Sequence, residues 1–276
     1  MKNVMILAGA GQIGMAIARR TGYNVKIVIG DKKLTNAQAV SKTMNEAGFD
    51  TETYEMDLAD RTSVHEFITH AASLGPVKAL VNAAGVSPSQ APIESILAID
   101  LYGTAMLLEE TRNVIEPGGV GIVISSQSGK RMGALTTHQD ELLATTPAEE
   151  LLNLEMLQPA NVHDTLHAYQ LAKRCNEKRV MAEAVHWGER GARINSISPG
   201  IIVTPLALDE FNGPRGDFYM NMFAKAPAGR PGTADEVANV AELLMSERGA
   251  FITGTDVLID GGATASYYYG PLKPEV

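Results

Sequence analysis

A tyrosine and a lysine four positions apart, Tyr169 and Lys173, could do chemistry together. On a helix, residues with this spacing lie on one face, about 5–6 Å apart. A phenol titrates at about pH 10, and a neighbouring ammonium lowers that pKa by stabilising the phenolate. The pair could then exchange a proton with an alcohol or carbonyl oxygen. An isolated copy of this spacing is more often a solvated helix face. The interpretation therefore requires a nucleotide site, a second hydroxyl and a suitable scaffold.

A glycine-rich turn near the N-terminus is a candidate nucleotide site. The apolar run Val4 to Ala8 leads into Gly9-Ala10-Gly11-Gln12-Ile13-Gly14, and Met15 to Arg20 continues as a helix. Strand, G-x-G-x-x-G and helix in this order are typical of dinucleotide binding. The glycines let the backbone approach a pyrophosphate, and the helix N-terminus offers it unpaired N–H groups. The alternative is a tight turn that binds nothing.

The residues after the second strand bear on the choice of dinucleotide. Val25 to Ile29 is the expected strand, and Asp31 lies 17 residues past Gly14. This is close to the spacing of about 20 residues expected for the acid that binds a ribose 2′-hydroxyl. We therefore expect NAD as the cofactor. NADP stays possible, because Lys32 and Lys33 follow directly and could bind a 2′-phosphate.

Apolar runs alternate with helical stretches along the rest of the chain. This alternation, without repeats or linker-like tracts, predicts a single α/β domain over residues 1–276. We expect a Rossmann-like, doubly wound parallel sheet with helices on both faces. Further strands are expected at 51–56, 79–81, 120–124, 193–197 and 257–259, and helices at 35–48, 63–73, 92–112 and 233–246, besides the helix that carries Tyr169 and ends near Trp187.

Two segments interrupt this rhythm. Residues 130–166 form an insertion with a short acidic helix expected at 148–157, and residues 206–227 form a second, irregular segment. Segments of this length are usually lids, binding segments or disordered. Their apolar residues could line a substrate site, or those of the insertion could pack on its own core or in a subunit interface. The tail with Tyr267, Tyr268 and Tyr269 is expected to be extended, as an oligomer contact, a wall of the site or an exposed end.

Composition excludes several kinds of function. The formal charge of −9 argues against nucleic acid or an anionic membrane as the main partner. The one cysteine, Cys175, rules out an internal disulfide and is expected to be a buried structural thiol. The six scattered histidines show no metal-ligand spacing, and no apolar run reaches membrane-spanning length. We expect a cytoplasmic protein with a small-molecule substrate and no metal.

Several short motifs occur in a defined order. They are Gly9–Gly14, Asp57-Leu58, Asn82-Ala83-Ala84-Gly85, Ile124-Ser125-Ser126, Tyr169-x3-Lys173, Arg193-Ile194-Asn195, Pro199-Gly200 with Thr204-Pro205, and Asp260-Gly261-Gly262. In this order the chain resembles the short-chain dehydrogenases/reductases over nearly its whole length. The resemblance implies a Rossmann-like core, a nicotinamide cofactor, and assembly as a homodimer or homotetramer.

The resemblance also implies roles for individual residues. Ser126 would hold the substrate oxygen, Tyr169 would be the general acid/base, and Lys173 would bind the nicotinamide ribose and lower the tyrosine pKa. The adenine would lie at Asp57 and the adenosine pocket at Asn82. All expected cofactor-binding residues are Gly9, Gly11, Gln12, Ile13, Gly14, Asp31, Lys32, Asp57, Leu58, Asn82, Ala83, Gly85, Tyr169, Lys173, and, on the nicotinamide side, Pro199, Gly200, Ile202 and Thr204.

The sequence departs from the family pattern at three places. Leu7-Ala8 replaces the usual Thr-Gly before the glycine loop. Asp100 stands where a helix asparagine usually supports a proton-relay water; it is retained as a catalytic candidate through its backbone carbonyl, with the role of its side chain open. Ser126 and Tyr169 are 43 residues apart, against about a dozen in most relatives. A similar insertion occurs in the subset that includes bacterial 3α-hydroxysteroid dehydrogenase/carbonyl reductase.

We therefore expect an NAD(P)-dependent oxidoreductase that interconverts a secondary alcohol and a ketone. The substrate is expected to be bulky and apolar, such as a hydroxysteroid or bile acid. Three alternatives are open: a reductase of smaller carbonyl compounds, a non-redox isomerase or epimerase, and a regulatory nucleotide-binding relative. Retention of NAD without net redox change would favour the isomerase, while Asp100 favours the regulator and the complete Ser–Tyr–Lys set counts against it.

Overall fold

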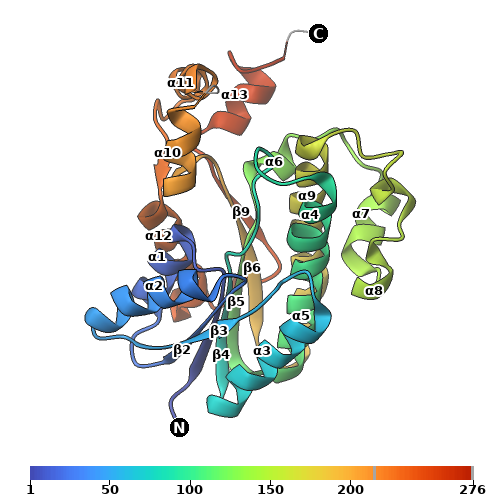
Figure 1. Ribbon diagram of the computed structural model, residues 1–276. Coiled ribbons are helices and arrows are strands. Elements are labelled where there is room, and N and C mark those ends of the chain that lie inside the picture. The colour runs from blue at the N-terminus through green and yellow to red at the C-terminus, as the bar shows by residue number, and fades with distance from the viewer. Residues whose placement is uncertain (214–215, 275–276) are drawn as a thin grey trace.

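The computed structural model describes residues 1–213 and 216–274, and within them the core is a parallel sheet (Figure 1). Its seven strands have the order β3-β2-β1-β4-β5-β6-β9, and every neighbouring pair is parallel. The expected doubly wound sheet is confirmed. The strands are β1 (Val4–Ala8), β2 (Lys26–Asp31), β3 (Asp50–Glu55), β4 (Val77–Asn82), β5 (Ile115–Ile124), β6 (Arg193–Pro199) and β9 (Asp256–Ile259).

Helices cover both faces of the sheet (Figure 1). One face carries α1 (Gln12–Thr21), α2 (Leu34–Glu46) and α12 (Ala234–Met245). The other carries α3 (Arg61–Leu74), α5 (Thr104–Val114) and α9 (Thr165–Glu189). Strand β1 shows why the sequences of the central strands are unbroken apolar runs. Its side chains alternate between the two faces, and both faces are covered, so all five residues are buried.

The strand order fixes where a ligand can bind. The order reverses between β1 and β4, and ligands of open α/β sheets bind outside the carboxyl ends of the strands at such a switch point. The glycine turn follows β1 and the Asn82 motif follows β4, so both open into the same crevice. Strand β5 begins at Ile115, earlier than the expected residue 120. Ile115 pairs with Val77 of β4, the register is then irregular, and regular pairing continues from Ala79 with Val120.

The insertion at 130–166 is helical and packs on the core. It contains α7 (Thr137–Thr145), α8 (Ala148–Leu151) and a 3₁₀ turn (Glu155–Leu157). Leu143, Leu151 and Leu157 are buried in the same apolar cluster as α5 and α9. Figure 1 shows α7 and α8 on the side of α9 away from α10 and α11. The prediction that these three leucines line a substrate site is wrong, and the alternative of packing on the chain's own core holds for them.

Charged groups fasten the insertion to its neighbours. Arg179 of α9 donates to the carbonyl oxygens of Leu143 and Thr146 at 3.3 and 2.6 Å. Arg179 also pairs with Glu109 of α5 at 3.0 Å, and the Glu109 carboxylate accepts the Ala148 N–H. Because buried charges are costly to leave unpaired, these contacts hold α7 and α8 in one position.

The second interrupting segment also forms helices. Residues 206–227 were expected to be irregular, but the structure has α10 (Pro205–Phe211) and α11 (Gly216–Lys225); residues 214 and 215 lie outside the described part. Thr204 caps α10 by accepting the Ala207 N–H at 3.2 Å. The ring of Phe211 lies edge-on to those of Tyr219 and Phe223. Local capping and aromatic packing thus outweigh the turn signals of glycine and proline.

The C-terminal tail is helical too, as α13 (Ala263–Tyr269), and the expectation of an extended tail is wrong. Tyr268 donates to the Lys130 carbonyl at 2.6 Å, and Ser266 donates to the Lys225 carbonyl at 2.7 Å. These contacts join the tail to α11 and to the segment after Ser126. The remaining elements are α4 (Ile93–Ile96), the π-helix η1 (Leu97–Gly103), α6 (Gln127–Lys130), β7 (Ile202–Val203), β8 (Gly232–Thr233) and a 3₁₀ turn (Glu247–Gly249).

The packing of α7 predicts a loss of stability on truncation. Leu143→Ala should lower the free energy of unfolding by about 2–5 kcal/mol, because it leaves a cavity at a fully buried position. Leu166→Ala is the control: that leucine is half exposed on α9, and its loss should change stability by about 0.5 kcal/mol or less. Urea unfolding measures both. Equal stability of the two variants would show that α7 is not part of the core.

Candidate active site

Two elements bring the serine, tyrosine and lysine together. Ser126 ends the turn after β5 and caps α6, while Tyr169 and Lys173 lie on α9. Helix α6 crosses α9 so closely that a Cβ at Gly129 would lie 2.9 Å from the Arg174 nitrogen. The Ser125 hydroxyl donates to the Lys173 carbonyl at 2.8 Å. The glycine and the first serine of Ser125-Ser126-x-x-Gly129 therefore hold the Ser126 segment against α9.

The Lys173 ammonium is buried between three groups. Its Nζ donates to the Ile124 carbonyl at 3.4 Å, lies 3.3 Å from Asp100 Oδ2, and lies 5.2 Å from the centre of the Tyr169 ring. Burial acts to lower the pKa of Lys173, but Asp100 and Tyr169 outweigh it and hold that pKa above its usual value. Lys173 is therefore positively charged at neutral pH beside the phenol, as proton exchange by Tyr169 requires.

Asp100 enters the site through its side chain. It lies in η1 and is fully buried, and its Oδ1 accepts the Val86 N–H at 2.8 Å. Burial raises the pKa of the Asp100 carboxyl, while Lys173 and the Val86 N–H favour the charged form. A Cβ at Gly85 would come within 3.1 Å of Oδ1, so the glycine leaves room for the carboxylate. The sequence motif had indicated a role for the backbone carbonyl and left the role of the side chain open.

The Ser126 hydroxyl can still donate a hydrogen bond to a ligand. Its Oγ accepts the Ser128 N–H at 3.1 Å, which makes it the N-cap of α6. A hydroxyl has one donor besides its acceptor lone pairs, so the Ser126 O–H can donate to a substrate oxygen. Tyr169 lies on the helix that the Ser126 segment crosses, so the two hydroxyls are candidates for binding one substrate oxygen. Two hydroxyl donors on one oxygen would polarise a ketone or bind an alcohol.

The glycines of the loop serve two different purposes. Gly9 has φ +92°, and a Cβ there would lie 2.5 Å from the Ala84 nitrogen; at Gly14 it would lie 2.9 Å from the Gly9 oxygen. At Gly11 no described atom would lie within 4 Å of a Cβ. Gly9 and Gly14 are thus required by the protein itself, whereas Gly11 leaves open space at the start of α1. Gln12 and Ile13 form the first turn of that helix, where free N–H groups favour a pyrophosphate.

Asp31 is fixed above this loop at the end of β2. Its Oδ2 accepts the Ala10 N–H at 3.0 Å and its Oδ1 accepts the Lys33 N–H at 2.9 Å. Lys32 pairs with Asp57 instead, at 2.7 Å. Burial acts to raise the pKa of Asp57, but Lys32 and the Ala59 N–H lower it below its usual value. The carboxylate of Asp31 is therefore fixed beside the glycine loop, and Lys32 is paired one strand away.

The adenosine candidates line the same crevice. Asn82 is buried at the end of β4 and donates to the Thr104 hydroxyl at 3.1 Å, and the Ala83 N–H donates to the Ala8 carbonyl at 2.9 Å. Leu58 follows Asp57 after β3 and is buried, and its carbonyl oxygen would clash with a Cβ at Gly103. Asn82 and Ala83 stand at the carboxyl end of β4, beside the switch point, whereas Leu58 follows the edge strand β3.

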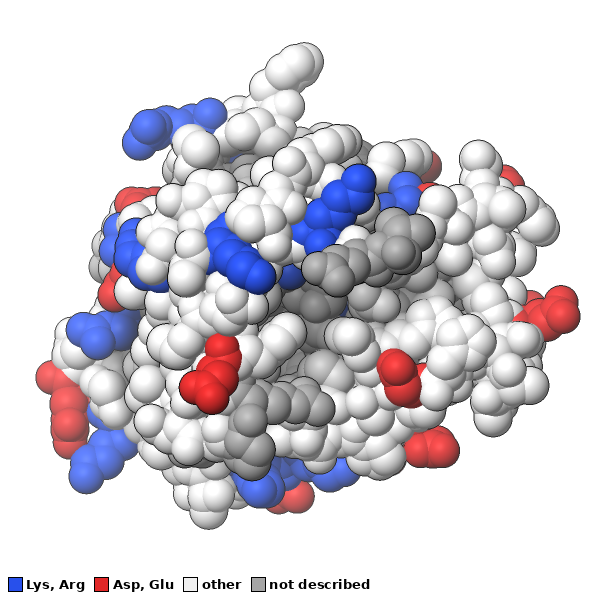
Figure 2. All heavy atoms as spheres, turned by 90° about the horizontal axis from the view of Figure 1, so that it is seen from above, with Lys and Arg blue, Asp and Glu red and all other residues white. Residues whose placement is uncertain are grey.

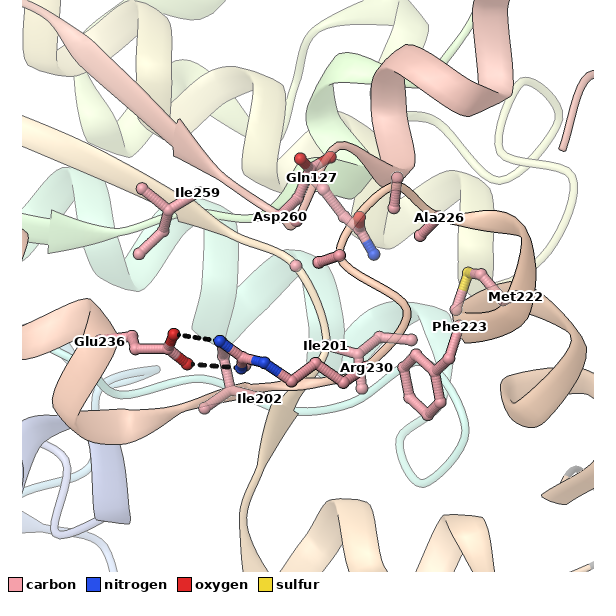
Figure 3. A pocket seen from close by; sticks show the side chains of 15 residues that line it. Gln127, Ile201, Ile202, Met222, Phe223, Ala226, Arg230, Glu236, Ile259 and Asp260 are labelled. Carbon is pink, nitrogen blue, oxygen red and sulfur yellow. Dashed lines mark hydrogen bonds and ion pairs between the residues drawn. The ribbon is translucent and has the colours of Figure 1, made fainter. Parts of the chain in front are cut away.

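Two of the nicotinamide candidates, Gly200 and Ile202, line a cavity of about 260 Å³ (Figure 3), whereas Pro199 and Thr204 are not among its lining residues. Pro199 ends β6, Ile202 begins β7, and a Cβ at Gly200 would come within 2.7 Å of the Asp260 Cα. In Figure 3, Gln127 and Asp260 lie at one end and the Arg230–Glu236 ion pair at the other. The lining residues are Gln127, Gly200, Ile201, Ile202, Met222, Phe223, Ala226, Ala228, Arg230, Gly232, Glu236, Ile259, Asp260, Gly261 and Ala263.

This cavity adds to the predicted site. It adjoins the Ser126 position through Gln127 but does not include Tyr169 or Lys173. Met222 and Phe223 belong to the second interrupting segment, whose apolar residues were predicted to line a substrate site, and both line this cavity. Gln127 was missed, although its place directly after Ser126 was a signal. Cys175 is buried, and burial raises the pKa of its thiol to about 12, which fits the expected structural role.

Some other kinds of site are absent from the described residues. Among residues 1–213 and 216–274, no group of three or more histidine, cysteine or acidic side chains could hold a metal ion. Within the same ranges, no helix is long and apolar enough to cross a membrane.

Known proteins match both halves of the chain. The family model described as short chain dehydrogenase matches residues 2–138, and the one described as Enoyl-(Acyl carrier protein) reductase matches residues 132–264. A short-chain dehydrogenase/reductase of Alternaria brassicicola is 37% identical over 96% of each chain. D-threitol dehydrogenase of Mycolicibacterium smegmatis is 30% identical, covering 95% of this chain and 93% of its own. The 3-alpha-hydroxysteroid dehydrogenase/carbonyl reductase of Comamonas testosteroni is 29% identical over 67% of this chain and 72% of its own.

Solved structures agree in fold. A 7α-hydroxysteroid dehydrogenase, complexed with NADH and 7-oxo glycochenodeoxycholic acid, superposes with a TM-score of 0.75 at 21% identity, covering 94% of this chain and 93% of its own. Together with the 37% identity to the Alternaria protein over 96% of both chains, these matches show that the chain belongs to the short-chain dehydrogenase/reductase family of oxidoreductases.

Proposed function

We propose that this enzyme interconverts a secondary alcohol and a ketone with NAD(H). The observation that carries the proposal is the buried Lys173 ammonium, 5.2 Å from the centre of the Tyr169 ring and on a helix crossed by the Ser126 segment. An ammonium held beside a phenol makes that phenol a better acid–base group at neutral pH.

Each residue has a defined task in this mechanism. NAD(H), when bound, supplies the hydride chemistry. The Ser126 hydroxyl donates to the substrate oxygen and orients it. In ketone reduction the Tyr169 hydroxyl gives that oxygen a proton, and in alcohol oxidation the phenolate takes the proton back. Lys173 stabilises the phenolate and can donate to the nicotinamide ribose.

Asp31 supports the preference for NAD(H). Its carboxylate can accept hydrogen bonds from ribose hydroxyls, whereas it would repel a 2′-phosphate that carries about −1.5 to −2 charges. Lys32, which could offset this repulsion, pairs with Asp57 in this structure. The glycine loop, the uncapped start of α1, Asp57, Leu58, Asn82, Ala83 and Gly85 would hold the rest of the dinucleotide.

We propose a bulky alicyclic ketone or alcohol, such as a hydroxysteroid or bile acid, as the substrate. The cavity beside Ser126 has an apolar wall formed by Ile201, Met222 and Phe223. Figure 2 looks onto the face that carries α10, α11 and α13, where uncharged residues cover most of the surface between scattered charges. The hydroxysteroid dehydrogenase relatives point the same way. The D-threitol dehydrogenase relative favours a second candidate, a smaller polyhydroxy substrate.

We also propose that the enzyme is a cytoplasmic homodimer or homotetramer. Met181 and Val185 on the outer side of α9 and Leu258 on the edge strand β9 expose between 38% and 65% of their surface. Apolar side chains in such positions favour contact with a second copy of the chain.

Loss of the Tyr169 hydroxyl should abolish turnover while the cofactor still binds. Tyr169→Phe keeps the ring but removes the proton donor, so the rate should fall on the order of 10²–10⁴-fold. Tyr23→Phe, at a residue 70% exposed, is the control and should keep wild-type activity. Steady-state rates and NADH titration by calorimetry measure the two effects. A Tyr169→Phe variant that retains most of its rate would refute the assigned role.

The wild-type enzyme should have a higher kcat/KM with NAD(H) than with NADP(H). Asp31→Ser should reduce this ratio by about tenfold or more, because hydrogen bonds to a charged group contribute about 1.5–3 kcal/mol each. Asp235→Ser, at an exposed side chain on α12, should leave the ratio unchanged. Equal efficiency of the wild type with both cofactors would contradict the role given to Asp31.

A substitution in the cavity should separate large from small substrates. Phe223→Ala should reduce kcat/KM for a hydroxysteroid by about tenfold or more and change that for cyclohexanol less, because the lost ring contacts only the larger ligand. Phe218→Ala on the same helix is the matched control, since that ring is 63% exposed. If Phe223→Ala affects both alcohols equally, the cavity does not select substrate size.

A further inference from the structure

A buried carboxylate offsets the charge of the catalytic lysine. Asp100 Oδ2 lies 3.3 Å from Lys173 Nζ, with side-chain exposures of 0% and 5%. An ion pair at this depth is screened little by solvent or salt. The same ammonium faces the Tyr169 ring. A group that offsets the charge of Lys173 therefore also weakens the effect of the ammonium on the Tyr169 phenol.

The local structure keeps Asp100 in this position. The Val86 N–H donates to Oδ1, and a Cβ at Gly85 would come within 3.1 Å of the same oxygen. The other oxygen, Oδ2, has no hydrogen bond of good geometry among the described residues, so its interaction with Lys173 is a charge–charge contact. The carboxylate is thus held by one oxygen and directed at the ammonium by the other.

The other charged groups packed around this part of α9 have partners of their own or are exposed. Lys130 of α6 pairs with Glu177 at 2.7 Å, and Asp140 of α7 pairs with Arg174 at 2.6 Å. Arg131 of α6 donates to Gln127 and Thr264, and Glu94 of α4 is exposed. Strand β5 contributes only the Ile124 carbonyl to Lys173. Asp100 is therefore the charge on a neighbouring element that acts most directly on Lys173.

We propose that Asp100 is a positioning residue that offsets the charge of Lys173 and so moves the working pH of Tyr169 upward. The inference rests on the proposed acid–base role of Tyr169. An unpaired ammonium stabilises a phenolate strongly, whereas a neutral ion pair acts on it only as a dipole. The phenol then keeps its proton to higher pH. This favours ketone reduction at neutral pH, because reduction needs the phenol and oxidation needs the phenolate.

Replacement by the uncharged isostere gives a signed prediction. In Asp100→Asn the full charge of Lys173 acts on Tyr169, so the phenolate should form about one pH unit lower. In plots of kcat/KM against pH, the acidic limb for alcohol oxidation and the basic limb for ketone reduction should both move to lower pH by that amount. The amide oxygen can still accept the Val86 N–H. Asp100→Ser is a second uncharged variant in case the first does not fold, and Asp100→Glu, which keeps the charge, should titrate like the wild type.

A readout without turnover separates this inference from the proposed function. The ultraviolet absorbance of the phenolate is titrated in each protein and in its Tyr169→Phe derivative, and the difference isolates Tyr169. The expected result is a titration about one unit lower in the uncharged variants than in the wild type and Asp100→Glu. Titrations that coincide, or that move to higher pH, would overturn the inference. An active Tyr169→Phe variant would refute the proposed function and leave this titration still measurable.

Discussion

The active site depends on the close crossing of α6 and α9. Only a glycine at position 129 lets the backbones meet, and the Ser125 hydroxyl fixes the contact by donating to the Lys173 carbonyl. The crossing places the Ser126 segment, which ends the turn after β5, next to the helix that carries Tyr169 and Lys173. The spacing of the tyrosine and lysine is local to one helix, whereas the serine reaches them only through this crossing. The insertion that separates Ser126 from Tyr169 in sequence packs elsewhere and leaves this crossing intact.

The fold could be predicted from the sequence because its signals are local. Buried parallel strands are visible in the sequence as short apolar runs. Asp31 and Asn82 end two of these strands, and Gly9 and Ser126 lie in the turns after two others, all at the carboxyl edge of the sheet. Much of the candidate site follows from the same motifs. The side chain of Asp100 does not, because its contact with Lys173 joins two helices that are distant in sequence. No periodicity in η1 indicates which way that carboxylate points.

Errors in the prediction have a common physical cause. The leucines of the insertion show that a segment is apolar, but not which surface it covers; Leu143 meets α9 rather than a ligand. Glycine and proline between 206 and 227 suggested irregular backbone, yet aromatic contacts such as Phe211 with Phe223 accompany two helices there. The tail tyrosines form a helix that is held through Tyr268 and Ser266. In each case tertiary packing decided the outcome, and local propensity does not reveal such packing.

The two edges of the sheet differ in a way that bears on assembly. Strand β3 ends one side and carries Asp50, Glu52 and Glu55, with Lys26 paired to the first two. Charges on an edge strand discourage another strand from pairing there. Strand β9 ends the other side, is four residues long, and exposes Leu258. Pairing of another strand is therefore disfavoured at β3 by charge and at β9 by shortness, where only four residues are offered. A sheet protected in this way at both ends is poorly suited to growing strand by strand into an open fibre.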